Sequence, residues 1–226
     1  MSSQLLMSQV ILQQRPRLTA EHYTLAQLTK RFVISEDWSI DQIDTWFRTQ
    51  IDVLWQELLD LQIPEELIDP LFKLHYALHD AVLLNEESQQ EILQAFKGPY
   101  DHEAVADYSK YQLDFYRLEK YLRFQTIDDA VPEGYLTVED FKHYQQVDRL
   151  LLNSRYYRVL KGLNTKNLKR LTQLALNEAM EGYIWGLKVK ESIFSMTYFR
   201  LQELTNVRAF LKAHRYGFDP EEFIYV

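Results

Sequence analysis

The sequence predicts an all-α protein in which about nine helices form one compact or two-lobed bundle with pseudo-repeats. Only 6 Gly and 6 Pro occur among the 226 residues, which disfavours folds that need many hairpin turns. Apolar residues recur at helical spacing almost throughout the chain, and capping residues precede most of these stripes. With 46% hydrophobic and 26% charged residues, the chain can also bury a sizeable core.

Capping patterns place the helices along the chain. Ser39 and Gln42 have the spacing of a capping box, Pro64 suits a first helical turn, and Thr137 can cap a later helix. Gly217 can adopt the left-handed conformation that ends a helix, and Pro220 can open a final turn. The expected helices lie at about 19–32, 39–58, 64–84, from 85, 102–123, 137–152, 164–187 and 192–214, with a last turn from 219.

No Gly/Ser-rich linker divides the chain, so residues 1–226 are predicted to form a single helical domain. The clearest loop is the polar stretch 128–134, which contains Pro132 and Gly134. If the domain has two lobes, this loop would separate them into residues 1–127 and 135–226.

Charge and composition restrict the function. The net charge of -8 argues against nucleic-acid binding, which needs a basic excess to displace counterions. The absence of Cys excludes disulfides, thiol catalysis and thiolate zinc sites. No apolar run reaches the roughly 18 residues of a membrane span, and the N-terminus does not resemble a signal peptide. We therefore expect a cytoplasmic protein that does not insert into the membrane directly.

The sequence contains no motif of a known reaction centre. It lacks phosphate-binding glycine loops, a nucleophile elbow and the His-Glu-x-x-His pattern, so we expect neither catalysis nor a cofactor. An alternative is a metal-binding helical enzyme that uses His75, His79 and His102, because the first two lie four residues apart on one helical face. The spacing permits such a site without specifying it, and we favour the alternative that His75 and His79 are partly exposed, hydrogen-bonded imidazoles beside an apolar face.

Basic residues are concentrated in one stretch of the second half of the chain. Residues 1–100 hold 7 basic and 15 acidic side chains, whereas residues 101–226 are balanced. The stretch 149–170 has seven cations, and no acidic residue follows them until Glu178: Arg149, Arg155, Arg158, Lys161, Lys166, Lys169 and Arg170. We expect an interface with an acidic partner here, with Arg155, Arg158 and Lys161 as its contact residues; the alternative is an ordinary solvated face.

Two helices resemble each other at a constant offset of 89 residues. The stretch 108–123 aligns with 197–212, so that Asp114 matches Glu203 and Arg117 matches Asn206. Each stretch has a helical apolar stripe, and in each the acid lies on the same face as the polar residue three positions later. Chance similarity between amphipathic helices is the alternative explanation.

The second of these helices carries a more specific pattern. Its acid is followed by Asn-aliphatic-Arg, a Gly-ended turn and Pro-Glu-Glu, at Glu203, Asn206, Val207, Arg208, Leu211, Gly217, Pro220, Glu221 and Glu222. This pattern resembles the closing helix of the C-type subunit of rotary V/A-type ATPases, whose eukaryotic form is the d-type subunit. Residues 108–123 are similar to the preceding repeat of that family, with Arg117 in place of its Asn.

The resemblance implies a non-catalytic connector that couples the central stalk to the membrane rotor ring. The partners would be stalk and ring subunits, and the protein would be peripheral to the membrane through that complex. The residues expected to clamp helices or form the interface are Asp114, Arg117, Arg123, Arg155, Arg158, Lys161, Glu203, Asn206 and Arg208. The alternative is a standalone helical adaptor or regulator with an unidentified protein partner.

Overall fold

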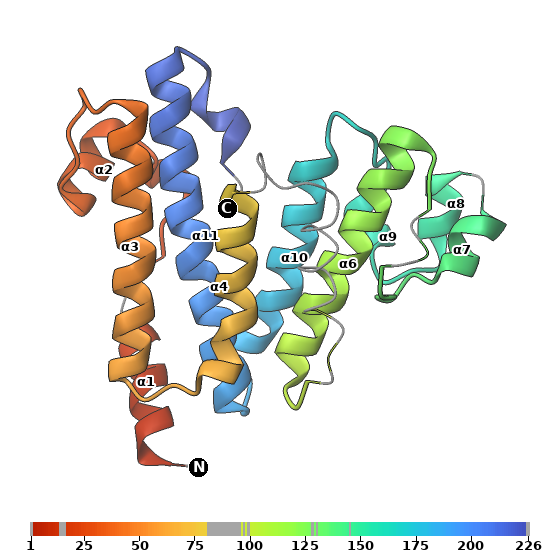
Figure 1. The fold of residues 1–226 in the computed structure, drawn as a ribbon, viewed down its shortest axis with the longest axis horizontal. Coiled ribbons are helices and arrows are strands. Elements are labelled where there is room, and N and C mark those ends of the chain that lie inside the picture. The colour runs from red at the N-terminus through yellow and green to blue at the C-terminus, as the bar shows by residue number, and fades with distance from the viewer. Residues whose placement is uncertain are drawn as a thin grey trace. The chain divides into compact units, whose positions relative to one another are not determined.

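The computed structural model of the chain is all-α. It describes residues 2–13, 17–80, 96, 98, 100–127, 129, 131–144 and 146–224, with the side chains at 74–80 and 221 outside the description. These residues form ten α-helices and two 3-10 helices, without a strand (Figure 1). In chain order they are α1 (Ser3–Gln13), η1 (Ala20–His22), α2 (Leu25–Phe32), α3 (Ile40–Asp60), α4 (Glu65–Asp80), α6 (Glu103–Phe124), α7 (Val138–His143), α8 (Val147–Leu152), α9 (Tyr157–Leu160), α10 (Leu168–Ile184), α11 (Val189–Tyr216) and η2 (Pro220–Phe223).

The chain divides into two compact units. Unit 1 combines Met1–Glu65 with Ser195–Val226, and unit 2 is the continuous stretch Glu66–Phe194. Helix α11 therefore begins in unit 2 and continues in unit 1. These units do not coincide with lobes at 1–127 and 135–226, because the loop after α6 belongs wholly to unit 2. That the chain acts as a single domain stays a prediction.

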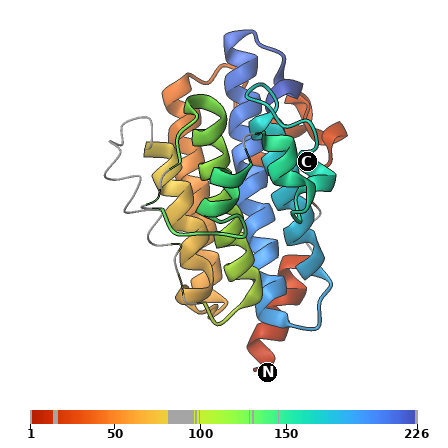
Figure 2. The ribbon, with the colours of Figure 1, turned by 90° about the vertical axis from the view of Figure 1, so that its right-hand side faces the viewer.

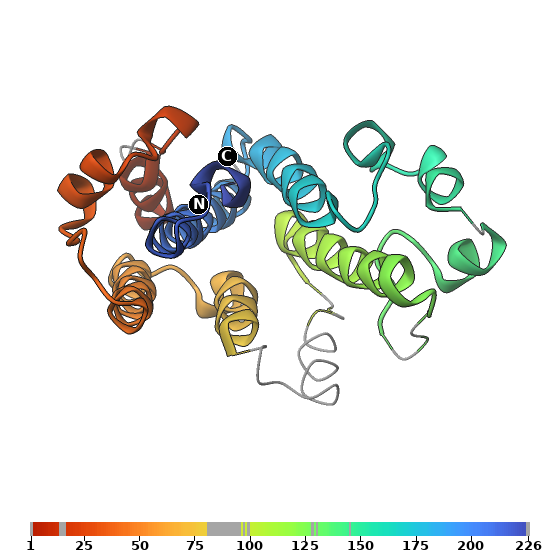
Figure 3. The ribbon, with the colours of Figure 1, turned by 90° about the horizontal axis from the view of Figure 1, so that it is seen from above.

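Unit 1 is built on the antiparallel pair α3 and α11, which lie side by side in two views (Figures 1 and 3). Both helices bury a stripe at helical spacing, which is what their amphipathic sequences predict. From α3 the buried residues include Phe47, Ile51 and Leu58, and from α11 they include Leu201, Val207 and Leu211. Helix α2 adds Leu28, which is fully buried.

Unit 2 is built on α6 and α10, which pack against each other. The short helices α7, α8 and α9 lie beside the end at which α6 finishes and α10 starts (Figures 1 and 2). Leu118 on α6, Met180 on α10, and Leu151 and Leu160 on the short helices are completely buried. This layered packing keeps a chain of short helices attached to two longer ones.

Several capping predictions are confirmed. Ser39 and Gln42 form a capping box at the start of α3, and Thr137 forms one with Asp140 at the start of α7. Gly217 has φ of 71° and follows α11 directly, as expected for a helix end. The final turn is a 3-10 helix that starts at Pro220.

Other helix boundaries differ from the prediction. Thr19 caps only the 3-10 turn, and α2 starts separately after Thr24. The helix expected over 137–152 is interrupted after His143, and the helix expected from 164 starts at Leu168. Helices α1 and α9 were not predicted, since neither has a strong cap with a long apolar stripe. The helix expected from Asn85 lies outside the described residues.

Among the described residues, no helix has the length and apolar character to cross a bilayer.

Candidate functional site

Asp114 is a fully buried acid of unit 2. It lies on α6 and accepts hydrogen bonds from the backbone N–H groups of Tyr135 (2.8 Å) and Leu136 (3.1 Å). The hydroxyl of Tyr156 donates to the same carboxylate. Burial raises the pKa of Asp114 to about 6, although these hydrogen bonds act in the opposite direction. One carboxylate therefore holds both the loop after α6 and the start of α9.

Arg117 holds the same loop one turn further along α6. Its fully buried guanidinium donates to the backbone carbonyls of Val131 (2.7 Å), Pro132 (3.3 Å) and Leu136 (3.3 Å). A guanidinium has several donors in a fixed plane, so it can bind more than one carbonyl at once. Asp114 and Arg117 together satisfy N–H and C=O groups on one short segment, which explains why this loop is not a boundary between lobes.

Glu203 has the corresponding position in unit 1. It lies on α11, is 6% exposed, and accepts from the backbone N–H of Leu18 (3.2 Å). Arg31 on α2 (2.9 Å) and Arg200 on α11 (3.3 Å) donate to the same carboxylate. The carboxylate thus links α11 to the segment before η1 and to α2.

Asn206 lies one turn beyond Glu203 and is also buried. It accepts from the side chain of Gln202 (3.3 Å) and lies beside the hydroxyl of Tyr23, the residue that follows η1. Burial raises the pKa of Tyr23 well above its ordinary value, so the phenol stays protonated. Asn206 therefore lies beside the residue that follows η1, whereas Glu203 binds the segment before η1.

Arg208 and Lys212 bind α11 to α3. Both cations donate to Asp44, from Arg208 Nε at 2.6 Å and from Lys212 Nζ at 2.8 Å. Partial burial alone would raise the pKa of Asp44, but the hydrogen bonds from the two cations outweigh it and lower the pKa. The guanidinium also lies 5.0 Å from the ring centre of Phe47.

The two repeated acids make similar contacts in the two units. At an offset of 89 residues, Asp114 and Glu203 each accept backbone N–H groups from a segment that leads into a short helix. Arg117, three residues after Asp114, binds that same segment, whereas Asn206, three residues after Glu203, lies beside Tyr23, on the other side of η1. The correspondence in contacts therefore holds for the two acids.

Two of the three predicted interface residues of the basic stretch form ion pairs within unit 2, and the third is exposed. Arg155 pairs with Asp107 (3.5 Å) and stacks on Tyr135 (3.8 Å), and Arg158 pairs with Glu178 on α10. Lys161 is exposed at the end of α9. Arg123, another predicted residue, forms an exposed pair with Glu119 one turn earlier on α6. Arg155 therefore lies beside the loop that Asp114 binds, whereas Arg123 and Arg158 pair with acids outside the buried clamps.

The metal hypothesis is not tested at His75 and His79, whose side chains lie outside the description. His102 is the residue before α6 and makes no side-chain capping bond. Among the described side chains, no group of three His, Asp or Glu residues could hold a metal ion. What the described polar groups offer is ion pairing and hydrogen bonding to segments of the chain.

Comparison of the chain with models of protein families, with curated proteins and with solved structures found no match. The likeness to the rotary ATPase subunit therefore stays a hypothesis that depends on the residues named above.

Sequence reasoning missed the partners of the predicted residues. Arg31, Asp44, Asp107, Gly134 and Tyr156 all contact a predicted residue or its loop. Asp44 could have been noticed, because it precedes the buried Phe47 by three residues and Ile51 by seven, which places an acid beside an apolar face. The other four have no comparable local pattern.

Proposed function

We propose that this chain is a non-catalytic connector of a rotary V/A-type ATPase, which couples the central stalk to the membrane rotor ring. The observation that carries the proposal is the repeated anchor. Asp114 and Glu203 stand at equivalent positions of two resembling helices, and each binds the segment that leads into a neighbouring short helix. The resemblance to the rotary ATPase subunit rests on these same two helices.

The internal contacts suit a part that must transmit force without yielding. In unit 1, one carboxylate on α11 binds α2, and one on α3 binds α11, through ion pairs of 2.6 to 2.9 Å. Charge-assisted hydrogen bonds are stronger and more directional than neutral ones, so they resist sliding of one helix along another. In unit 2, the buried Asp114 and Arg117 give the loop after α6 a fixed position.

The direct test is affinity purification of the tagged, full-length chain from membranes of its native host, followed by mass spectrometry. Stoichiometric recovery of stalk subunits and ring protein is the expected result. A host strain that expresses the tag alone gives the background. Recovery of the chain by itself, or with soluble proteins unrelated to rotary ATPases, would overturn the connector proposal in favour of a standalone adaptor.

A matched pair of variants makes this test more specific. Glu203→Gln removes the charge that binds Arg31 and Arg200, whereas Glu139→Gln changes an acid that is 83% exposed. If stiffness of unit 1 is required for coupling, the first variant lowers recovery of the stalk subunits severalfold and the second leaves it unchanged. Equal recovery of the stalk subunits with both variants would show that the contacts of Glu203 are not needed for coupling.

A further inference from the structure

Four cations project from the turn between α9 and α10 in unit 2. Lys161, Lys166, Lys169 and Arg170 are all exposed, and we call them the cationic corner. Within the part of the chain that the structure describes, none of the four forms an ion pair. The two neighbouring arginines differ, since Arg155 and Arg158 are each paired with an acid of the same unit. Apart from the exposed Arg149 on α8, the unneutralised charge of the basic stretch is therefore concentrated at this turn.

The turn that carries the cationic corner is held rigidly. Asn164 accepts the backbone N–H groups of Lys166 (2.9 Å) and Asn167 (3.3 Å), and Asn167 accepts that of Asn164 (2.8 Å). Both amides donate to the carbonyl of Gly162 at 3.1 Å. On either side, Leu163 and Leu168 are buried. The cations thus project from a backbone that need not be ordered when a partner binds, which lowers the entropic cost of binding.

Helix electrostatics do not explain the cationic corner. Lys169 and Arg170 lie in the first turn of α10, which contains no acidic residue. The N-terminal end of a helix carries a partial positive charge, so cations there are unfavourable and acids are favourable. Folding of the isolated chain would therefore be served better by acidic residues at these positions, and a negatively charged partner would account for the cations.

We infer that the cationic corner docks a carboxylate-rich segment of a partner protein. Leu171 and Leu174 are half-buried on α10, next to Lys169 and Arg170, so the surface offers apolar contact as well as charge. A peptide with acidic and apolar side chains matches both features, whereas a phosphodiester backbone matches only the charge. The net charge of -8 also repels long polyanions, which favours a short acidic segment over nucleic acid or an anionic bilayer.

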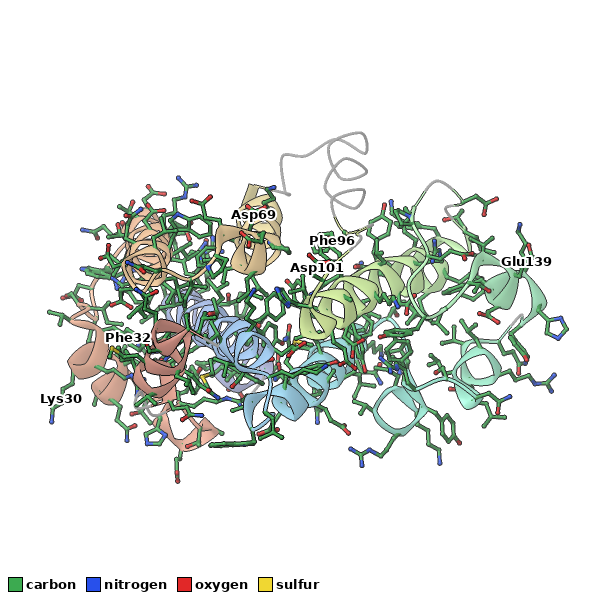
Figure 4. The ribbon with its side chains drawn as sticks, turned by 90° about the horizontal axis from the view of Figure 1, so that it is seen from below. Lys30, Phe32, Asp69, Phe96, Asp101 and Glu139 are labelled. Atoms are coloured by element: carbon green, nitrogen blue, oxygen red, sulfur yellow. The ribbon has the colours of Figure 1, made fainter. Side chains whose placement is uncertain are left out.

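The test compares two variants of the full-length chain with the same net charge. One is Lys166→Glu, Lys169→Glu and Arg170→Glu; the control is Lys30→Glu, Lys142→Glu and Arg215→Glu, which changes three exposed cations elsewhere. Figure 4 shows Lys30 pointing away from α2. The probe is a fluorescein-labelled peptide of about 20 residues that repeats Glu-Glu-Leu-Ala, and binding is followed by fluorescence anisotropy at two salt concentrations.

We expect the wild type to bind the peptide more weakly as salt increases, and the cationic-corner variant to bind at least about tenfold more weakly than the wild type. The control variant should stay within about twofold of the wild type. The melting temperature of the cationic-corner variant should equal or exceed that of the wild type, because its new acids favour the start of α10. If it nevertheless fails to fold, the neutral variant Lys166→Gln, Lys169→Gln and Arg170→Gln replaces it, with the same expected loss.

Absence of peptide binding by the wild type, or an equal loss in both charge-matched variants, would overturn the inference. Tighter binding of a labelled oligodeoxynucleotide, or of vesicles containing phosphatidylserine, would overturn it in favour of a different class of partner. The test uses no rotary ATPase subunit. Its failure is therefore distinguishable from failure of the proposed connector function.

Discussion

Gly134, in the loop after α6, packs directly against that helix. A Cβ atom at this position would overlap the carboxylate of Asp114 and the backbone carbonyl of Lys110. Gly134→Ala should therefore destabilise the protein by about 2 kcal/mol or more, as overpacked cores do. Urea denaturation followed by circular dichroism measures this. Gly182→Ala is the control, because its Cβ would meet nothing within 4 Å and alanine favours the interior of α10; it should stabilise by about 0.5–1 kcal/mol. Equal effects of the two changes would contradict the packing argument.

The carboxyl group of Asp114 should make the folded protein more stable as the pH falls. Its pKa is about 6 in the folded protein because of burial, against an ordinary value of 3.8. Between these values the folded state binds more protons than the unfolded state, so the unfolding free energy rises as the pH falls through this window. A shift of this size corresponds to ~3 kcal/mol at most. Urea unfolding from about pH 7 to about pH 4 should therefore show the wild type gaining stability relative to Asp114→Asn.

Asp44 provides a control, because its effect on stability should change with pH in the direction opposite to that of Asp114. Burial opposes its ionisation, but Arg208 and Lys212 outweigh this effect and lower its pKa in the folded state. Asp44 therefore contributes stability above the ordinary pKa of an aspartate, and this contribution is lost as the pH falls through the lowered value. Below about pH 4, the loss of unfolding free energy in Asp44→Asn relative to the wild type should become smaller. In the same pH range, the loss in Asp114→Asn should have reached its largest value. The same direction of change for both variants would contradict the assigned causes.

At the scale of the element, Glu203 links α11 to α2 through its ion pair with Arg31. Glu203→Gln leaves Arg200, whose side chain is 14% exposed, without the carboxylate that now faces it at 3.3 Å. Breaking a buried ion pair by removing one charge typically costs about 3–5 kcal/mol. Since Arg31 is 31% exposed and keeps access to water, we expect the lower end of that range, measured by urea denaturation. The matched change Glu139→Gln should cost less than about 0.5 kcal/mol, and an equal loss would argue against the clamp.

Local sequence patterns predicted helix starts better than helix interruptions. Ser39 and Thr137 were identifiable because a capping box has a fixed spacing of three residues. The interruption after His143 has no Gly or Pro to mark it, so the helical pattern is continuous from Thr137 to Leu152 in the sequence alone. At α10, the hydrogen bonds between Asn164 and Asn167 delay the helix by one turn, and their competition with helix formation depends on geometry.

The clamp residues were predictable as polar positions on helix faces, but their partners were not. Glu203 binds residues 185 and 172 positions away in the sequence, and Arg208 binds one 164 positions away. A helical stripe shows which face is buried and carries no information on which segment covers it. Arg155 illustrates the consequence, since it is exposed as its sequence context indicates, but the sequence does not reveal Asp107 as its ion-pair partner.

At the scale of the whole chain, unit 1 is assembled from both ends of the sequence and unit 2 from its middle. A division at the polar break 128–134 assumed that each lobe is continuous. In the structure this break lies inside unit 2, where Asp114 and Arg117 bind it to α6. Unit 1 depends instead on α11, which returns to the N-terminal helices and pairs with Asp44 on α3.

The division into units predicts that a local defect spreads mainly within its own unit. Gly134→Ala disturbs the loop bound by Asp114, so hydrogen exchange should accelerate more in α6 and α7 than in α2 and α3. Glu203→Gln should show the reverse order, because its partners Leu18 and Arg31 lie in unit 1. Native-state exchange with peptide-level mass spectrometry resolves these helices, and Gly182→Ala serves as the reference without a packing defect. Uniform acceleration across all four helices in either variant would mean that the two units unfold as one cooperative structure, since partial opening confined to a unit cannot expose amides outside it.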